Sequence, residues 1–443
     1  MRLSTDLLDT DPSQPTRAAS DGAALASVTA GSHRRPFARI GLLIGVCAFL
    51  FVAPLAVRQP NSYDGVAMER VAVGLADHLN PLVSQVPDQF KLNTPYSTYG
   101  LATSVVMAPL AAVGRATGTD PTIWMNLANA LIVGATCVVV FETLRRRGVS
   151  QRIATTTTAL VLMGTPLLAY ALTDFSEPGV ALMIAIAVLG LDGESRRTRY
   201  AASGVGAAVG GSILFRTDSV VLIALPVAAA LMVLSRRKTR AAVLFALGAA
   251  PSMCVWAWYN AARYGNPLAG GYRHQHFTHS FLRGAYGLTL SPGRGVLVYI
   301  PLLIIAFAVI PTLRRTDLTL GVLAIALLGL RVAFYARWWA WYGGSIWGPR
   351  FLVPVVPAFA PAIAAALQRW QARPAWIAPV VLASVAISAT GVWLTPHWEH
   401  NPYFLREPQV RGGAQRIMAH VTDPAYVRDV DDTLFDWSVF PFR

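Results

Sequence analysis

The chain has 443 residues, of which 54% are hydrophobic and only 14% are charged, and its formal net charge is +14. A soluble protein carries about a quarter charged residues, so this composition excludes an ordinary soluble domain. Apolar runs of about 17–22 residues recur along the chain, and a helix of that length crosses the core of a bilayer. Because helices satisfy their own backbone in lipid, the sequence predicts an all-α polytopic membrane helical bundle.

The positive charge is concentrated in short clusters between the apolar runs, at 145–152, 195–199, 235–240 and 314–315. Loops with excess Lys and Arg stay on the cytoplasmic side of a membrane. No basic stripe is interleaved with aromatic residues, as single-stranded nucleic acid binding requires. The charge therefore indicates membrane orientation, and we expect no nucleic acid partner.

In chain order, residues 1–36 are polar and predict a disordered cytoplasmic N-terminus, and 37–395 form the transmembrane domain. About eleven spans are expected there: 40–57, 122–143, 154–172, 177–191, 200–215, 219–234, 241–261, 295–313, 318–335, 351–368 and 375–395. This topology puts every basic cluster inside. It also puts the C-terminal tail, 396–443, on the outer side of the plasma membrane.

One apolar segment, 99–115, does not fit this topology as a further span. If it crossed, Arg145, Arg146 and Arg147 would lie outside, against the positive-inside rule. We therefore expect a juxtamembrane or re-entrant helix against the outer leaflet. The run 204–211, GVGAAVGG, lies inside a span, so its glycines indicate close helix packing rather than a nucleotide-binding loop.

Ionisable and aromatic residues gather in the segments expected outside. They are Asp64 and Glu69, Asp174 and Glu177, Arg216 and Asp218, Arg273 and His276, Arg294, Trp341 and Tyr342, and Arg350. Carboxylates at a membrane boundary can act as general bases, and arginines can bind a phosphate through two hydrogen bonds. Trp and Tyr can stack on a sugar. Such a set suits a lipid-linked phosphate and a hydroxyl to be deprotonated.

Each of these features also has a plainer interpretation. Asp64 can be a helix N-cap alone, and Glu69 can be a solvated helix residue. Asp174 and Glu177 can cap the next span, and the pair Arg216 and Asp218 can be a structural ion pair. The histidines of RHQHFTH lack zinc spacing, so phosphate contact or solvation is favoured over metal, and the tryptophans alone would form an aromatic belt.

Five motifs resemble the integral-membrane, GT-C type glycosyltransferases that use polyprenyl-phosphate sugars, including the protein O-mannosyltransferase-like family and the aminoarabinose transferases. They are SYDG at 62–65, TPYSTYGLATSVVMAPL at 94–110, TDFSEP at 173–178, GLTLSPGRGVLVYIP at 287–301 and WWAWYGGSIWGPRFLVPVVP at 338–357. The resemblance covers about residues 37–395. It implies juxtamembrane helices in the first outer loop, which agrees with the expected place of 99–115.

The resemblance implies that Asp64 is the general base of the first outer loop, and that Glu177 or Asp174 is a second acidic residue orienting the acceptor or assisting a metal. Charge and position make Arg294, Arg350 and Arg273 the candidates for binding the donor phosphate. Glu69, Trp341, Tyr342 and His276 are the candidates for the acceptor or sugar. No cofactor is required, although a divalent metal is compatible with the acidic residues.

The expected function is transfer of a sugar from a polyprenyl-phosphate donor to a glycan, lipid or protein acceptor at the outer membrane face. Mannose or arabinose on the cell envelope is the first expectation. The chain departs from the family in having a single Asp followed by Gly in SYDG, where a pair of acidic residues is usual. Two alternatives stay open: a transporter or flippase, which should show mid-span charges and internal repeats, and an inactive GT-C-like assembly partner.

Overall fold

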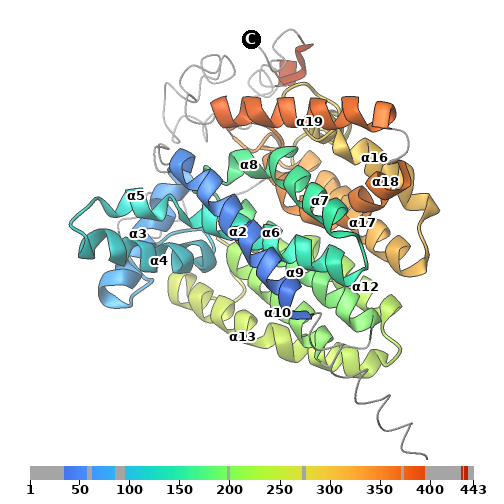
Figure 1. Cartoon of the computed structure of the whole chain (residues 1–443). Coiled ribbons are helices and arrows are strands. Elements are labelled where there is room, and N and C mark those ends of the chain that lie inside the picture. The colour runs from blue at the N-terminus through green and yellow to red at the C-terminus, as the bar shows by residue number, and fades with distance from the viewer. Residues whose placement is uncertain are drawn as a thin grey trace, which may run out of the picture.

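The computed structural model describes residues 34–56, 62–84, 95–196, 200–271, 276–344, 346–370, 374–394, 431–432 and 434–437. Throughout these residues the regular structure is helical, and no strand occurs among them. Figure 1 shows long helices packed side by side, with α19 across one end of the bundle. The expected all-α membrane bundle is confirmed for the described part of the chain.

The helices are described here in two sets, divided near the middle of the chain. The first set is α2 (Arg34–Ala56), α3 (Tyr63–His78), α4 (Leu101–Ala116), α5 (Pro121–Met125), α6 (Ala128–Arg146), α7 (Gln151–Met163), α8 (Leu167–Tyr170), α9 (Glu177–Ser195) and α10 (Ala201–Phe215). The second set is α11 (Ser219–Leu222), α12 (Ala224–Leu234), α13 (Lys238–Tyr264), α14 (Phe281–Thr289), α15 (Val296–Tyr299), α16 (Leu302–Val309), η1 (Ile310–Thr312), α17 (Arg315–Arg337), η2 (Arg350–Phe359), α18 (Ala360–Trp370) and α19 (Pro374–Leu394).

Seven described helical segments are long and apolar enough to cross a membrane. They are Arg39–Ala56, Pro121–Arg146, Glu177–Ser195, Lys238–Tyr264, Arg315–Arg337, Arg350–Trp370 and Ile377–Leu394. The other four expected spans are helical but shorter or interrupted: α7 with α8, α10, α11 with α12, and α15, α16 and η1. The count of eleven crossings therefore stays a prediction, because length alone supports seven.

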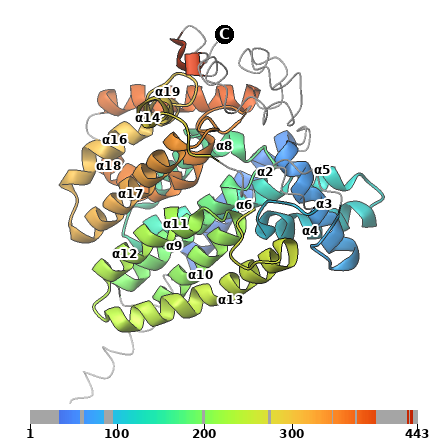
Figure 2. The ribbon, with the colours of Figure 1, turned by 180° about the vertical axis from the view of Figure 1, so that it is seen from behind.

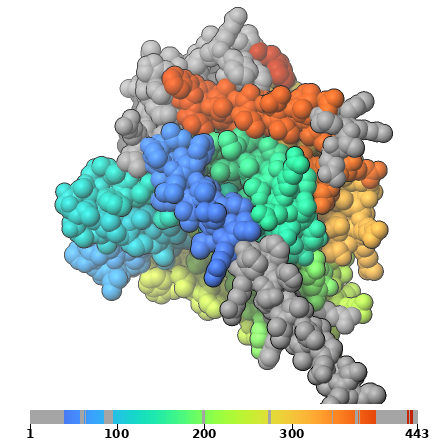
Figure 3. All heavy atoms as spheres, viewed as in Figure 1, coloured from blue at the N-terminus to red at the C-terminus, as the bar shows by residue number. Residues whose placement is uncertain are grey.

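The segment expected to lie against the outer leaflet forms α4, whose 16 residues are fewer than the seven long segments have. Met107 and Ala111 of α4 pack against Met68 and Ala72 of α3. In Figure 1 the helices α3, α4 and α5 form a group at one edge of the bundle, and the space-filling view shows the same group as a lobe beside α2 (Figure 3). Such a separate group agrees with juxtamembrane helices.

Glycines allow neighbouring helices to approach closely. A Cβ at Gly45 of α2 would lie 3.0 Å from the Gly134 carbonyl oxygen of α6. A Cβ at Gly206 would lie 2.0 Å from the Phe245 carbonyl oxygen, so the GVGAAVGG run packs α10 directly on α13. Seen from behind, α10 and α13 lie next to each other in Figure 2. Gly206, Gly210 and Gly211 of this run therefore serve helix packing, whereas a Cβ at Gly204 would meet no atom within 4 Å.

The expected C-terminal tail falls mostly outside the described residues, but part of 431–437 is described. Asp431 is buried and accepts hydrogen bonds from Arg283 Nε at 2.7 Å and from Trp341 Nε1 at 3.0 Å. Its carboxylate also lies 3.2 Å from His279 Nε2. This part of the tail is thus attached to the loops around α14 and the Trp-rich segment.

Candidate active site

The first turn of α3 carries Asp64, and the residue that caps this helix is Ser62. The Ser62 hydroxyl accepts a hydrogen bond from the Gly65 amide at 2.9 Å. Ser is a preferred N-cap because its oxygen satisfies an amide that has no partner within the helix. The capping role considered for Asp64 is therefore filled by Ser62, which leaves the Asp64 carboxylate available for other contacts.

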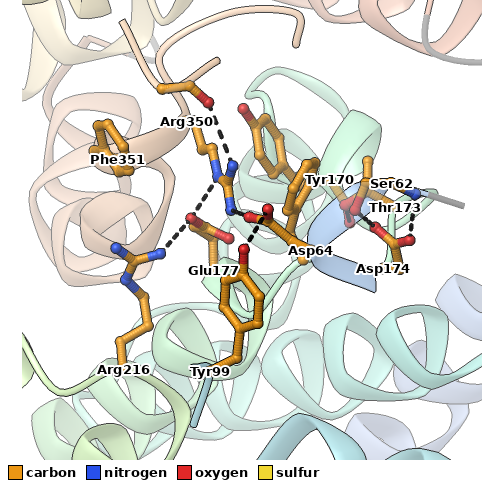
Figure 4. Close-up of polar contacts among 12 residues, drawn as sticks. Ser62, Asp64, Tyr99, Tyr170, Thr173, Asp174, Glu177, Arg216, Arg350 and Phe351 are labelled. Carbon is orange, nitrogen blue, oxygen red and sulfur yellow. Dashed lines mark hydrogen bonds and ion pairs between the residues drawn. The ribbon is translucent and has the colours of Figure 1, made fainter. Parts of the chain in front are cut away.

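Both carboxylate oxygens of Asp64 have strong donors (Figure 4). Tyr99 donates its hydroxyl to Oδ1 at 2.7 Å, and Arg350 donates Nη2 to Oδ2 at 2.6 Å. Burial alone would raise the pKa of Asp64, but the charge of Arg350 and these hydrogen bonds outweigh it. The pKa of Asp64 therefore lies below its ordinary value, and the side chain is a carboxylate at neutral pH.

Arg350 lies between two acidic residues that are far apart in sequence. Its Nε donates to Glu177 Oε1 at 2.7 Å, while Nη2 binds Asp64. The guanidinium carbon lies 3.7 Å from the centroid of the Phe175 ring, a cation–π distance. The structure therefore brings Asp64, Glu177 and Arg350 together from three distant segments of the chain.

Arg216 extends this network, although the sequence indicated only a local pair with Asp218. Its Nη1 donates to Glu177 Oε1 at 2.8 Å, and its Nη2 lies 3.3 Å from Asp218 Oδ2 and 3.0 Å from the Tyr335 hydroxyl. We call Asp64, Glu177, Arg216, Asp218 and Arg350 the ionic network. It joins the ends of α3, α9, α10 and η2, with Arg216 directly after α10.

Exposure differs within the ionic network. Glu177 has no exposed side-chain surface, whereas the side chains of Asp64 and Arg350 retain 15% and 11%. Arg216 retains 13%. A ligand can therefore contact Asp64 and the arginines, while Glu177 lies behind them as a buried counter-charge.

Asp174 lies outside the ionic network. Its Oδ2 accepts from the Ser62 amide at 2.6 Å, and its Oδ1 accepts from the Ser62 hydroxyl at 2.5 Å. Burial raises the pKa of Asp174 to about 6, although the hydrogen bonds from Ser62 lower it; the nearby charge of Asp64 adds to the rise. The sequence does not distinguish between Asp174 and Glu177 as the second acidic residue, whereas the structure gives them different hydrogen-bond partners.

Glu69 is buried on α3, so its interpretation as a solvated helix residue is wrong. Burial, together with the negative charges of Asp174 and Asp120, raises its pKa to about 8. Glu69 therefore holds a proton at neutral pH.

The remaining candidates lie elsewhere. Arg294 is buried and donates to three backbone carbonyls, of Tyr342 at 2.8 Å, of Gly293 at 2.9 Å and of Gly344 at 2.9 Å. It therefore supports the loop that precedes Arg350, and no described contact joins it to the ionic network. Its proposed part in phosphate binding stays a prediction.

Trp341 is buried and donates to Asp431, so it contacts the C-terminal segment, and Tyr342 is buried beside it. His276 is exposed, and its carbonyl accepts from the Trp339 amide. Arg273 lies outside the described residues. Among the described residues, no three His, Cys, Asp or Glu side chains are arranged to hold a metal ion.

Tyr99 and Asn129 are among the contributors that were missed from the sequence. Tyr99 lies in the segment TPYSTYG that already carried part of the resemblance, so its motif was a signal. Asn129 lies in α6 and donates to the carbonyls of Thr173 and Phe175, at 2.6 and 2.8 Å. It had no local signal, because its partners are more than forty positions away.

No protein-family model matches the chain, and no curated protein matches it. Solved structures do match, among them two of ArnT. The apo crystal structure of ArnT from Cupriavidus metallidurans matches with a TM-score of 0.54 and 17% identity, over 92% of this chain and 76% of that one. ArnT from the same organism bound to undecaprenyl phosphate matches with a TM-score of 0.55 and 15% identity, over 89% and 74%. The chain therefore has the GT-C-like fold of ArnT, a polytopic bundle of membrane helices.

Proposed function

We propose that the protein is an inverting glycosyltransferase of the plasma membrane that transfers a sugar from a polyprenyl-phosphate donor to an acceptor hydroxyl. One observation supports this above all others: a carboxylate and an arginine, partly exposed and hydrogen-bonded to each other, stand at the start of a juxtamembrane helix and of a spanning segment. The likeness to a structure of ArnT with undecaprenyl phosphate adds weight to a lipid-phosphate ligand.

The donor phosphate binds Arg350 in this proposal. The guanidinium presents several N–H groups in one plane, which suits a phosphate, and Phe175 supports its face. Arg216 binds the buried carboxylate of Glu177, as Arg350 does, and adds positive charge. The phosphate competes with Asp64 for Arg350, so donor binding weakens the ion pair that keeps the Asp64 carboxylate weakly basic.

Asp64 then acts as general base. Its carboxylate takes the proton of the acceptor hydroxyl, the hydroxyl oxygen forms a bond to the anomeric carbon, and the bond from that carbon to the phosphate oxygen breaks. Attack from the face opposite the phosphate inverts the anomeric configuration. Polyprenyl phosphate leaves as a stable anion, so no acid is needed to protonate it.

The finer assignments belong to the same proposal. The sugar is a hexose or pentose, mannose or arabinose first, and the acceptor is a cell-envelope glycan, lipid or protein. Arg294 and Arg273 assist phosphate binding, and Glu69, Trp341, Tyr342 and His276 serve the acceptor side. The reaction takes place at the outer face, with the N-terminus in the cytoplasm and the C-terminus outside.

The test is transfer of label from radioactive polyprenyl-phosphate sugars to envelope acceptors by the purified protein in liposomes. Asp64→Asn should reduce transfer at least a hundredfold without lowering the unfolding temperature by more than a few degrees, since a general base contributes roughly 10²–10⁴ in rate. Asp77→Asn is the matched control, because Asp77 lies on the same helix in an exposed pair with Arg115.

One result would overturn the role of Asp64, and another would overturn the proposed enzyme activity. Equal transfer by Asp64→Asn and the unchanged protein would remove Asp64 from the mechanism. If the unchanged protein transferred label from none of the lipid-linked donors, the enzyme reading would fail, and the transporter and inactive-partner alternatives would gain support.

A further inference from the structure

The acidic loop TDFSEP holds two carboxylates, and only Glu177 joins the ionic network. We propose that Asp174 is a positioning residue, and that Asn129, Asp174 and Ser62 form a clamp that fixes the first turn of α3 and thereby aims Asp64 at Arg350. This inference rests on the proposed function for the role of Asp64. The clamp itself is argued from contacts alone.

The clamp begins in a membrane span. Asn129 is 1% exposed in α6, within the spanning segment Pro121–Arg146. Its side-chain amide donates to the carbonyl of Thr173 at 2.6 Å and to the carbonyl of Phe175 at 2.8 Å. These carbonyls lie on either side of Asp174 in the chain. One buried side chain therefore holds the backbone around Asp174 against a long helix.

Asp174 connects the backbone held by Asn129 to the start of α3. Each of its carboxylate oxygens accepts one hydrogen bond from Ser62, from the amide at 2.6 Å and from the hydroxyl at 2.5 Å. The same Ser62 hydroxyl accepts from the Gly65 amide at 2.9 Å, so it also caps the helix. Figure 4 shows Asp174 facing Ser62, apart from the Arg350 contacts.

Gly65 gives a second and independent sign of this close fit. A Cβ built on Gly65 would lie 1.6 Å from Asp174 Oδ2 and 2.0 Å from its Cγ. Real Cβ atoms do not approach other atoms so closely, so any side chain at position 65 would displace the carboxylate or the helix. The glycine after Asp64 in SYDG, where the family usually has an acidic residue, is thus explained by the contact with Asp174.

These contacts favour positioning over a direct part in the reaction. Both Asp174 oxygens are occupied by Ser62, and the residue is only 5% exposed. The same loop also places Phe175 under the Arg350 guanidinium and Glu177 on its Nε. The loop therefore sets the positions of both members of the Asp64–Arg350 pair, and a displacement of about 1 Å there can cost a hundredfold in rate.

The first experiment needs no substrate. Amide hydrogen exchange of the full chain in detergent is followed by mass spectrometry for peptides covering the start of α3. Asn129→Ala, Asp174→Ala and Ser62→Ala should each speed exchange there at least tenfold, while α9 stays protected. Ser150→Ala is the matched control, since Ser150 caps α7 in the same manner and no described side chain of another helix or loop binds its hydroxyl. Ser62→Thr retains the hydroxyl and should restore protection.

Gly65 supplies a double-mutant test for the case in which a single variant is unstable. Gly65→Ala should speed exchange strongly when Asp174 is present and much less in Asp174→Ala, which lacks the two nearest atoms. Gly204→Ala is the control, because a Cβ there has no atom within 4 Å. Additive effects of Gly65→Ala and Asp174→Ala, or an unchanged exchange rate in Ser62→Ala, would overturn the clamp.

The second experiment separates the clamp from the proposed function. Ser62→Ala should lower kcat for sugar transfer at least tenfold, with the donor KM changed less than threefold, and Ser62→Thr should recover most of the kcat. A clamp seen by exchange in a protein without any transfer would refute the function and leave the clamp. Transfer that is unaffected by Ser62→Ala, despite faster exchange, would refute the positioning role.

Discussion

Replacing Arg350 with Met tests the ionic network most directly. Met keeps much of the side-chain volume but removes the donors to Asp64 Oδ2 and Glu177 Oε1, at 2.6 and 2.7 Å, and the cation over Phe175. Glu177 still has Arg216, whereas Asp64 keeps only the Tyr99 hydroxyl among its described partners. The variant therefore leaves the largely buried Asp64 carboxylate without a hydrogen-bonded cation.

The expected cost follows from the burial of these groups. Removing one partner of a buried ion pair costs about 3–5 kcal/mol, because a desolvated charge remains. An unfolding entropy of about 2.1 cal/mol/K per residue gives roughly 0.9 kcal/mol/K for a chain of 443 residues. The unfolding temperature should therefore fall by about 3–5 °C.

The charge state of Asp64 also determines how the destabilisation by Arg350→Met changes with pH. In the unchanged protein, its low pKa means that the contribution of the pair is complete above the ordinary Asp value and is lost only under strong acid. Without Arg350, burial is opposed only by the Tyr99 hydrogen bond and the more distant charge of Arg216, so the pKa of Asp64 rises and the carboxyl takes up a proton more readily as the pH falls. The destabilisation should thus be smaller at pH 5 than at pH 8.

The assay is thermal unfolding in one detergent at pH 5 and pH 8, with Arg350→Met, Asp64→Asn and the double variant. The double variant should be destabilised by about 1–3 kcal/mol less than the sum of the single variants. Arg115→Met is the control, since its partner pair with Asp77 is exposed and contributes about 0–1 kcal/mol. Additive single effects, or an Arg350→Met loss no larger than that of Arg115→Met, would refute the reasoning.

Three further predictions concern the surroundings of Asp64. Because burial raises the pKa of Glu69 to about 8 from about 4.5 in the unfolded chain, unfolding releases a proton between these values, and Glu69 should lower the stability by about 1.4 kcal/mol for each unit that the pH rises there. Glu69→Gln should remove this contribution in thermal scans from pH 6 to 8, above the raised pKa of Asp174. Tyr99→Phe removes the donor to Asp64 Oδ1, so sugar transfer should fall about tenfold with little change in unfolding temperature, and an unchanged kcat would refute the role of the hydroxyl. Arg263 donates to the carbonyls of Ser97 and Tyr99, so Arg263→Met should raise amide exchange in residues 97–101 at least tenfold, and unchanged exchange would contradict this support.

The sequence predicts the membrane class and the position of most helices, because a bilayer requires long apolar runs and these are visible one by one. It does not predict where spans are interrupted. The run 154–172 divides into α7 and α8 at Gly164 and Pro166, and 295–313 divides into α15, α16 and η1 around Pro301 and Pro311. A hydropathy window averages over such breaks, whereas proline removes a backbone donor at one residue.

The candidate site is predictable in part for a related reason. Asp64, Glu177 and Arg350 stand out because a charge at the end of an apolar run is rare. The expected topology also places the ends of these three runs on the same side of the membrane. Arg294 has the same signal and yet binds three backbone carbonyls. Charge and position select the residues near a site, but they do not say whether the side chain faces a ligand or a loop.

Residues that act through the backbone carry even less signal in sequence. Asn129 is a single amide within an apolar helix, and its two acceptors are main-chain oxygens whose identity does not depend on the side chains of Thr173 and Phe175. A buried side-chain amide without hydrogen bonds would cost free energy, so an Asn within a span indicates a polar partner without naming it. The pairing of Asn129 with the acidic loop therefore requires the fold, and the fold in turn explains why Asp174 and Glu177, three residues apart, differ in role: one faces the capped helix start and the other faces the arginines.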